Sequence, residues 1–235
     1  MIMDVTNDEE MMVRVPCGTY YGKSDELLIV GGHHDTVYHA PGAVDDTSGT
    51  ATVLEMATMF SEYVSENGEP DRTVRFCTWG GEEEGLWGST SYVADKNQAL
   101  AENLRLYVNL DMNHVDKDAT RGNSVTLFTN HPTDYSHIKS LAEEYRKNYP
   151  SMADKYTINV GLYDGELGES NGMPCNSDHC PFVYELDEKR GRAAVCYGSG
   201  SWEYHTYLDE MDRFNEESLG ISITIYSNYM KFLAW

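Results

Sequence analysis

The stretch LLIVGGHHDTVYHAPGAVDDTSGTATVLEMA, residues 27–57, runs from an apolar segment through a polar loop into a helical pattern. Its beginning, within Glu26–Gly32, is a short apolar run that is typical of a strand buried on both faces. After the loop, apolar residues recur at helical spacing, which predicts a helix over residues 46–64. The loop carries several histidines and aspartates, and carboxylates packed so closely repel one another unless a positive charge lies among them.

The rest of the chain continues this alternation of strand and helix patterns. Further strands are predicted over residues 72–80, 104–112, 124–130, 156–163 and 193–198. Further helices are predicted over residues 88–100, 134–148 (ended by Pro150) and 219–233. The alternation predicts an α/β fold with a central mixed, largely parallel β-sheet flanked by helices. At 235 residues, the chain is expected to form a single domain over residues 1–235, with a short N-terminal lead-in over residues 1–25.

The chain is strongly acidic, with 39 Asp and Glu residues against 17 Lys and Arg residues and a net charge of −22. Such a surface repels phosphate groups, which argues against nucleic acid or an anionic membrane as a partner and is compatible with metal ions.

The sequence has no apolar run of about 18 residues, so we expect no transmembrane helix. Its first residues are acidic rather than basic, so no signal peptide is predicted in the chain as written.

Polar side chains follow three of the predicted strands at the points where these strands end. The sequences GGHHD, WGGEEEG and NLDMN stand at these points. In open α/β sheets, ligands bind at the carboxyl ends of the strands. The coincidence therefore predicts a functional site at this edge of the sheet. Two later stretches, NSDHCPF and WEYHTYLDEMDRF, add further histidines and aspartates.

The residue types in these clusters suit divalent metal ions. Histidine and carboxylate ligands bind zinc, and a pair of ions about 3.5–4 Å apart can share one bridging carboxylate. Each cluster also has a simpler interpretation: Asp46 can cap the helix that it precedes, Asp45 can be solvated, and EEE can form a charged turn. The patterns of other hydrolases are missing from the sequence, which contains neither G-x-S-x-G nor H-E-x-x-H.

The five cysteines include no C-x-x-C pair, which argues against a thiolate zinc site. Cys175 and Cys180 are close enough in sequence to be bridged, and two free buried thiols fit the pattern equally well. The odd number of cysteines leaves at least one of them unpaired.

The motifs resemble those of the M28 peptidase family, the zinc-dependent co-catalytic aminopeptidases and their relatives. The matching stretches are, in order, GGHHDT, GAVDDTSGTA, WGGEEEGLWGS, VNLDMN, SDHCPF and YHTYLDEMD. They extend from Gly31 to Asp212, which is most of the chain. The resemblance implies a zinc-exopeptidase-like fold. The lead-in before Gly31 is shorter than the family usually has, so we expect a minimal or truncated variant.

The resemblance also implies a set of metal ligands for two divalent ions, taken to be zinc. His33 and Asp111 would hold one ion, and Glu83 and His205 would hold the other. Asp45 would bridge the two ions. The family further places a cis peptide bond directly after the bridging aspartate, and therefore after Asp45 in this chain.

The resemblance also implies the catalytic and substrate-binding residues. Glu82 would be the general base that takes a proton from the attacking water. Asp35 would orient His33, as carboxylates often orient metal-binding histidines. Asp178 and His179 would lie beside the substrate site.

The predicted function is therefore that of a metal-dependent exopeptidase, an aminopeptidase that removes N-terminal residues from peptide substrates. A carboxypeptidase of the same family is an alternative, in which Arg190 or Arg192 would meet a substrate carboxylate. A glutaminyl cyclase, which uses one zinc ion, is another alternative. A binding module on the same scaffold, without catalysis, is the remaining one.

Overall fold

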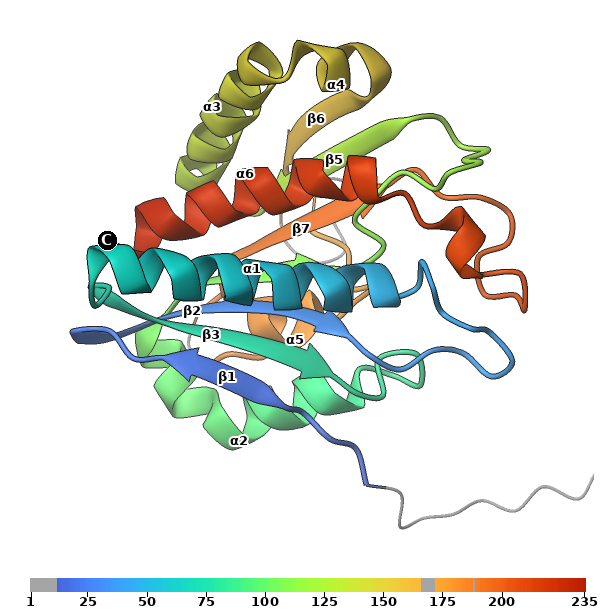
Figure 1. Cartoon of the computed structure of the whole chain (residues 1–235). Coiled ribbons are helices and arrows are strands. Elements are labelled where there is room, and N and C mark those ends of the chain that lie inside the picture. Colours follow the sequence, from blue (N-terminus) through green and yellow to red (C-terminus); the bar gives the residue numbers. More distant parts are fainter. Residues whose placement is uncertain (1–11, 166–171, 188) are drawn as a thin grey trace, which may run out of the picture.

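The computed structural model describes residues 12–165, 172–187 and 189–235. Within these residues the strands are β1 Cys17–Tyr20, β2 Ser24–His33, β3 Arg72–Trp79, β4 Leu104–Leu110, β5 Ser124–Thr129, β6 Thr157–Leu162 and β7 Ala193–Gly198. The helices are α1 Thr47–Asn67, α2 Trp87–Asn103, α3 Pro132–Asn148, α4 Pro150–Lys155, α5 His179–Tyr184 and α6 Glu216–Ala234, with a 3-10 helix, η1, at Met211–Arg213. The strands of this part of the chain form one sheet in the order β1-β3-β2-β4-β7-β5-β6 (Figure 1).

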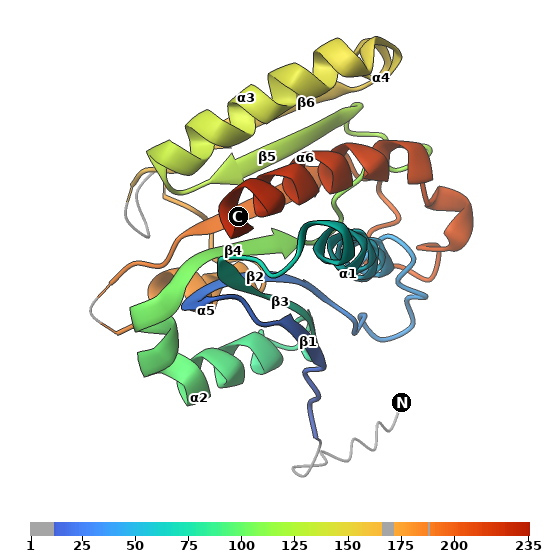
Figure 2. The same ribbon diagram turned by 60° about the vertical axis from the view of Figure 1, so that its left-hand side comes forward.

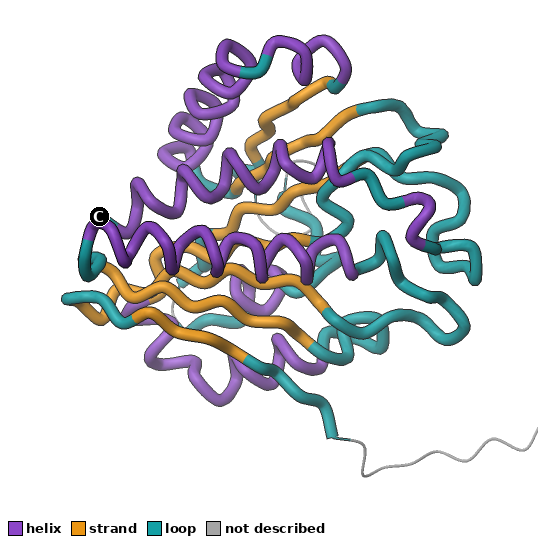
Figure 3. The backbone as a smooth tube through the Cα atoms, viewed as in Figure 1, coloured by secondary structure: helices purple, strands orange, loops and turns teal. Residues whose placement is uncertain are grey.

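The central strands are parallel, so their carboxyl ends lie at one edge of the sheet. β2 pairs in parallel with β3 on one side and with β4 on the other, and β4 pairs in parallel with β7. β1 is antiparallel to β3, β5 is antiparallel to β7, and β6 is parallel to β5. The prediction of a mixed, largely parallel sheet is confirmed. Long loops follow the strands at the carboxyl edge (Figure 3).

Helices cover both faces of the sheet, with α1, α3 and α6 on one face and α2 and α5 on the other (Figures 1 and 2). Alternate residues of a strand point to opposite faces. Leu28 and Val30 of β2 therefore pack in one apolar core with Phe60 of α1. Ile29 packs in the other core with Phe182 of α5. Because both faces are buried, the strand needs an almost continuous apolar run, and this explains the pattern seen in the sequence.

Most predicted elements agree with the structure, and the differences are short elements. β1 is a four-residue strand at the edge of the sheet, too short to show a periodic pattern. α4 begins at Pro150, which was expected only to end the preceding helix. Proline fits the first turn of a helix because the missing N–H would have no partner there.

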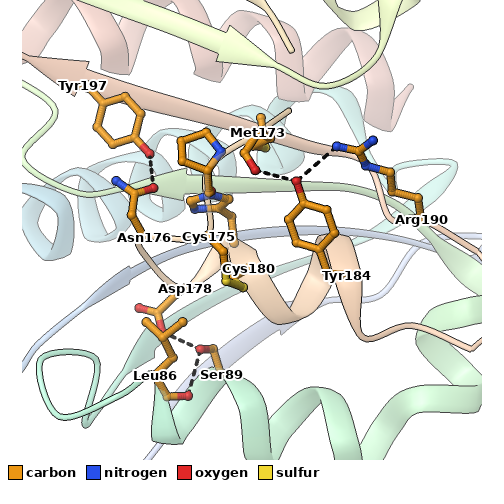
Figure 4. Close-up of a disulfide and its surroundings, with 12 residues drawn as sticks. Leu86, Ser89, Met173, Cys175, Asn176, Asp178, Cys180, Tyr184, Arg190 and Tyr197 are labelled. Atoms are coloured by element: carbon orange, nitrogen blue, oxygen red, sulfur yellow. Dashed lines mark hydrogen bonds between the residues drawn. A yellow bond between two sulfur atoms is a disulfide. The ribbon is translucent and has the colours of Figure 1, made fainter. Parts of the chain in front are cut away.

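Among the described residues, disulfide bonds join Cys17 to Cys77 and Cys175 to Cys180, while Cys196 is a buried free thiol. The first bond ties the edge strand β1 to β3. The second closes the loop before α5 (Figure 4), so the choice that the sequence left open is answered in favour of a bridge.

None of the helices in the described ranges combines the length and the hydropathy needed to cross a membrane.

Candidate active site

The carboxyl edge of the sheet brings together two histidines and three carboxylates. His33 is the last residue of β2, and Asp111 directly follows β4. Asp45 lies in the loop between β2 and α1, Glu83 in the loop between β3 and α2, and His205 in the loop that precedes η1. These are the side chains that the resemblance assigned as metal ligands, and the structure places them together.

The side chains form two groups that share Asp45. In the first group, His33 Nε2 lies 3.1 Å from Asp45 Oδ1 and 3.8 Å from Asp111 Oδ1. In the second group, His205 Nε2 lies 3.0 Å from Asp45 Oδ2 and 3.1 Å from Glu83 Oε2. The donor atoms of each group all lie within 4.8 Å of one another. The two oxygens of one carboxylate therefore face two different histidines.

The two groups fit divalent cations in both chemistry and burial. Imidazole nitrogens and carboxylate oxygens are the usual non-thiolate donors to zinc. His33 and Asp45 are buried, and Glu83 Oε1 is a buried oxygen without a hydrogen-bond partner among the described residues. A buried charged oxygen without a partner is costly, and a cation in each group would remove that cost.

The crowding of charges shifts the pKa values of the groups in the metal-free protein. Burial raises the pKa of Glu82 to about 8, and nearby carboxylates add to this effect. Burial also raises the pKa of Glu83 to about 7, and the neighbouring Asp45 adds to it. For His33, burial lowers the pKa, but the surrounding carboxylates outweigh burial and the net pKa is raised.

Asp35 connects the histidine end of β2 to the loop that carries the glutamates. Its carboxylate accepts hydrogen bonds from the backbone N–H of Glu82 at 3.1 Å and of Glu83 at 3.2 Å. His33 Nδ1 lies 3.1 Å from the backbone carbonyl oxygen of Asp35 and 3.6 Å from its carboxylate. The Asp35 carboxylate therefore also holds the loop of Glu82 and Glu83 in place. The sequence did not indicate this contact.

Asp46 joins three elements of the fold directly behind the candidate ligands. The peptide bond between Asp45 and Asp46 is cis, which confirms the expectation drawn from the resemblance. The buried Asp46 carboxylate accepts hydrogen bonds from the backbone N–H groups of His33, Gly49 and Met112 at 3.1, 2.9 and 3.0 Å. Asp46 therefore caps α1, as one interpretation of the sequence held, and also fixes the ends of β2 and β4.

Asp209 is a residue of the site to which the sequence analysis assigned no role. Its carboxylate accepts hydrogen bonds from the backbone N–H of Val44 at 2.9 Å and of Asp45 at 3.0 Å. It lies four positions after His205, so it connects the loop of the second histidine to the loop of the shared carboxylate. Its only signal in the sequence was its place in the YHTYLDEMD stretch.

Asp178 and His179 lie in the interior next to the candidate ligands. Ser89 Oγ donates to Asp178 Oδ1 at 2.5 Å (Figure 4), and burial raises the pKa of Asp178 to about 7. Burial lowers the pKa of His179 to about 4, and its Nε2 lies 2.6 Å from the carbonyl oxygen of Pro174. Both side chains are buried, so their contact with a substrate stays a prediction.

The arginine contacts suggested for a carboxypeptidase are not made at this site. Arg192 directly precedes β7, at the opposite edge of the sheet, and its Nε donates to Asp134 at 2.8 Å. Arg190 donates to the hydroxyl of Tyr184 at 3.1 Å (Figure 4). Because Arg192 is paired with the buried Asp134 at the opposite edge of the sheet, the suggestion that it meets a substrate carboxylate is wrong. The same suggestion for Arg190 stays a prediction.

The fold and the site define the chain as an α/β protein with a candidate two-metal centre at the carboxyl edge of its sheet. The chain belongs to peptidase family M28, whose sequence profile matches residues 17–230. The family resemblance found in the motifs is thereby confirmed.

Named relatives and solved structures agree with this family. The chain is 28% identical over 230 residues to probable leucine aminopeptidase 2 of Aspergillus oryzae, covering 94% of this chain and 44% of that protein. It is 37% identical over 201 residues to aminopeptidase NAALADL1 of Mus musculus, covering 80% of this chain and 26% of that protein. An aminopeptidase from Aneurinibacillus sp. strain AM-1 has a similar structure, with a TM-score of 0.64, 25% identity and coverage of 92% of this chain and 47% of that chain. This chain spans less than half the length of each of these proteins.

The raised pKa values lead to an expected pH dependence of the metal-free protein. A carboxyl group with a raised pKa in the folded state stabilises that state below the unfolded pKa and loses this contribution as the pH rises through the folded pKa. Glu82 and Glu83 rise from an ordinary value of 4.5 to about 8 and about 7. We therefore expect the thermal unfolding midpoint of the metal-free protein to fall between about pH 5 and pH 8.

A pair of matched variants isolates the contribution of the buried glutamate. Glu82→Gln removes one of the titrating groups and should make the pH dependence between about pH 5 and pH 8 less steep, with Glu83 still contributing. Glu84→Gln changes an exposed residue of the same loop and should leave the slope as it is. A slope that is the same in all three proteins would show that Glu82 does not carry the effect.

Proposed function

We propose that this chain is a zinc-dependent aminopeptidase that hydrolyses the N-terminal residue from peptides. The observation that carries the proposal is the position of Asp45, whose two oxygens lie 3.1 Å from His33 and 3.0 Å from His205. A carboxylate placed in this way between two histidines suits a bridge between two cations. The three similar proteins described above are all named as aminopeptidases, which supports the same activity.

In this proposal, His33 and Asp111 would hold one zinc ion, Glu83 and His205 would hold the other, and Asp45 would contribute to both. When bound, the pair of ions supplies Lewis-acid chemistry, because it makes a water molecule more acidic and polarises a carbonyl group. The presence of two donor groups favours the two-metal peptidase over a glutaminyl cyclase, since a single zinc ion would occupy one group and leave the other without a cation.

Glu82 is the general base of the proposal. Its side chain is 11% exposed and one oxygen lies 4.0 Å from His33 Nε2, so it faces the first donor group. A carboxylate positioned beside the reacting groups is a typical general base. Glu82 accepts the proton of the attacking water and returns it to the amine that leaves. Backbone hydrogen bonds to Asp35 hold the loop in the position that this transfer requires.

Activity and its metal dependence can be measured together with leucine p-nitroanilide. We expect release of p-nitroaniline, loss of release after chelation, and recovery when zinc is returned. The matched substrate N-acetyl-leucine p-nitroanilide lacks the free amine and should not be hydrolysed. Equal hydrolysis of the blocked and free substrates would contradict an aminopeptidase, and activity that survives complete metal removal would contradict the zinc dependence.

Glu82→Gln tests the general base separately from metal binding. The amide cannot accept the proton, and positioned proton transfer is worth about 10²–10⁴-fold, so we expect kcat to fall by about that factor. Zinc content should stay unchanged because Glu82 is outside both donor groups. The exposed Glu84→Gln variant of the same loop should keep wild-type kcat. Full activity of Glu82→Gln would assign the base to another residue.

A further inference from the structure

A pocket of about 320 Å³ opens beside Asp111. One wall is Asp111 itself, and Tyr204, next in sequence to His205, forms another. Met112 and Tyr197 add apolar surface to the lining. The volume is at the lower end of the range for small-molecule sites, which suits a single residue better than an extended chain. A substrate held at the candidate metal centre would have this pocket next to it.

Hydrogen-bond donors without partners line this pocket. The hydroxyl of Ser201 is buried and has no hydrogen-bond partner among the described residues. The Oδ1 atom of Asn176 accepts from the hydroxyl of Tyr197 at 3.0 Å (Figure 4), which leaves the amide nitrogen of Asn176 as a donor. The buried hydroxyl of Ser201 is costly without a partner, so it fits a ligand that brings an acceptor atom, and the exposed amide of Asn176 can donate to the same ligand.

Arg121 is the one Lys or Arg residue among those lining the pocket. It makes no hydrogen bond or ion pair with any residue that the structure describes. Arg72, Arg105, Arg192 and Arg213 each contact a carboxylate of the fold. In a chain with a net charge of −22, an arginine without such a carboxylate partner, placed at a pocket beside the candidate active site, is available for an anionic ligand.

We propose that this pocket binds a carboxylate of the substrate, with Arg121 as the cation and Ser201 and Asn176 as neutral donors. The inference rests on the proposed aminopeptidase function and adds a substrate class to it. The substrate's amino end would lie at the candidate metal centre, and its carboxylate would lie in the pocket. The carboxylate is supplied either by an acidic N-terminal side chain or by the free C-terminus of a dipeptide.

Glutamate and glutamine substrates test the first source, because their side chains differ in charge and hardly in size. With the zinc-loaded protein, we expect kcat/KM for glutamate p-nitroanilide to exceed that for glutamine p-nitroanilide by about tenfold or more, as a charge-assisted hydrogen bond would give. Arg121→Gln should abolish this preference. Lys117→Gln removes the same charge from an exposed position nearby in the chain, outside the pocket lining, and should keep the preference.

Dipeptides test the second source. Leucyl-glycine carries a free carboxylate and leucyl-glycinamide does not. If the carboxylate in the pocket is the C-terminus, leucyl-glycine should be the better substrate by about tenfold, and Arg121→Gln should remove the difference. A preference for a carboxylate that depends on Arg121, in either pair of substrates, supports the proposal.

Calorimetric titration of the zinc-loaded Glu82→Gln protein, in which hydrolysis is expected to be slow, with L-glutamate, L-glutamine, leucyl-glycine and leucyl-glycinamide separates the pocket from catalysis. If a carboxylate ligand binds more tightly than its uncharged counterpart and Arg121→Gln removes the difference, the pocket proposal stands even when no substrate is hydrolysed, and the aminopeptidase proposal fails. If leucine p-nitroanilide is hydrolysed but no carboxylate preference depends on Arg121 in kinetics or binding, the pocket proposal is overturned and the aminopeptidase proposal stands.

Discussion

The repulsion among buried carboxylates at the carboxyl edge of the sheet is the constraint on which the candidate site depends. Asp45, Glu83 and Asp111 face one another across distances that suit cations, and two histidines complete the set. The fold opposes this repulsion by fixing the backbone on all sides. Asp46 and Asp209 accept backbone hydrogen bonds that hold the ends of strands and the loop of Asp45. The carboxylates of Asp46 and Asp209 are thus used to hold the backbone in place. Those of Asp45, Glu83 and Asp111 remain available to a metal ion.

This division of roles links the sheet to the chemistry proposed for the site. Parallel strands bring three loops to one edge, and short, buried strand ends leave their side chains little freedom. In the proposal, the amino end of a peptide lies at the candidate metal centre, and the neighbouring pocket offers Arg121 to a negative group. A substrate that carries a carboxylate would therefore be held at two places, at the candidate metal centre and at the Arg121 pocket.

The sequence predicted the fold and the candidate site best where one short stretch contains both a strand and the polar side chains at its end. Apolar runs that end in GGHHD, WGGEEEG and NLDMN predicted both the strands and the side chains at their ends. Contacts between distant segments could not be predicted in this way. Asp209 binds the backbone of Asp45 across 164 positions, and Cys17 joins Cys77 across 60. The pocket around Arg121 likewise exists only after several loops have come together.

The central claim is that one carboxylate, Asp45, lies between two zinc ions. The most direct test is anomalous diffraction at the zinc edge from crystals of the zinc-loaded protein. We expect two peaks about 3.5–4 Å apart, one beside His33 and Asp111 and one beside Glu83 and His205. A single peak in fully loaded crystals, or peaks that do not flank Asp45, would contradict the claim.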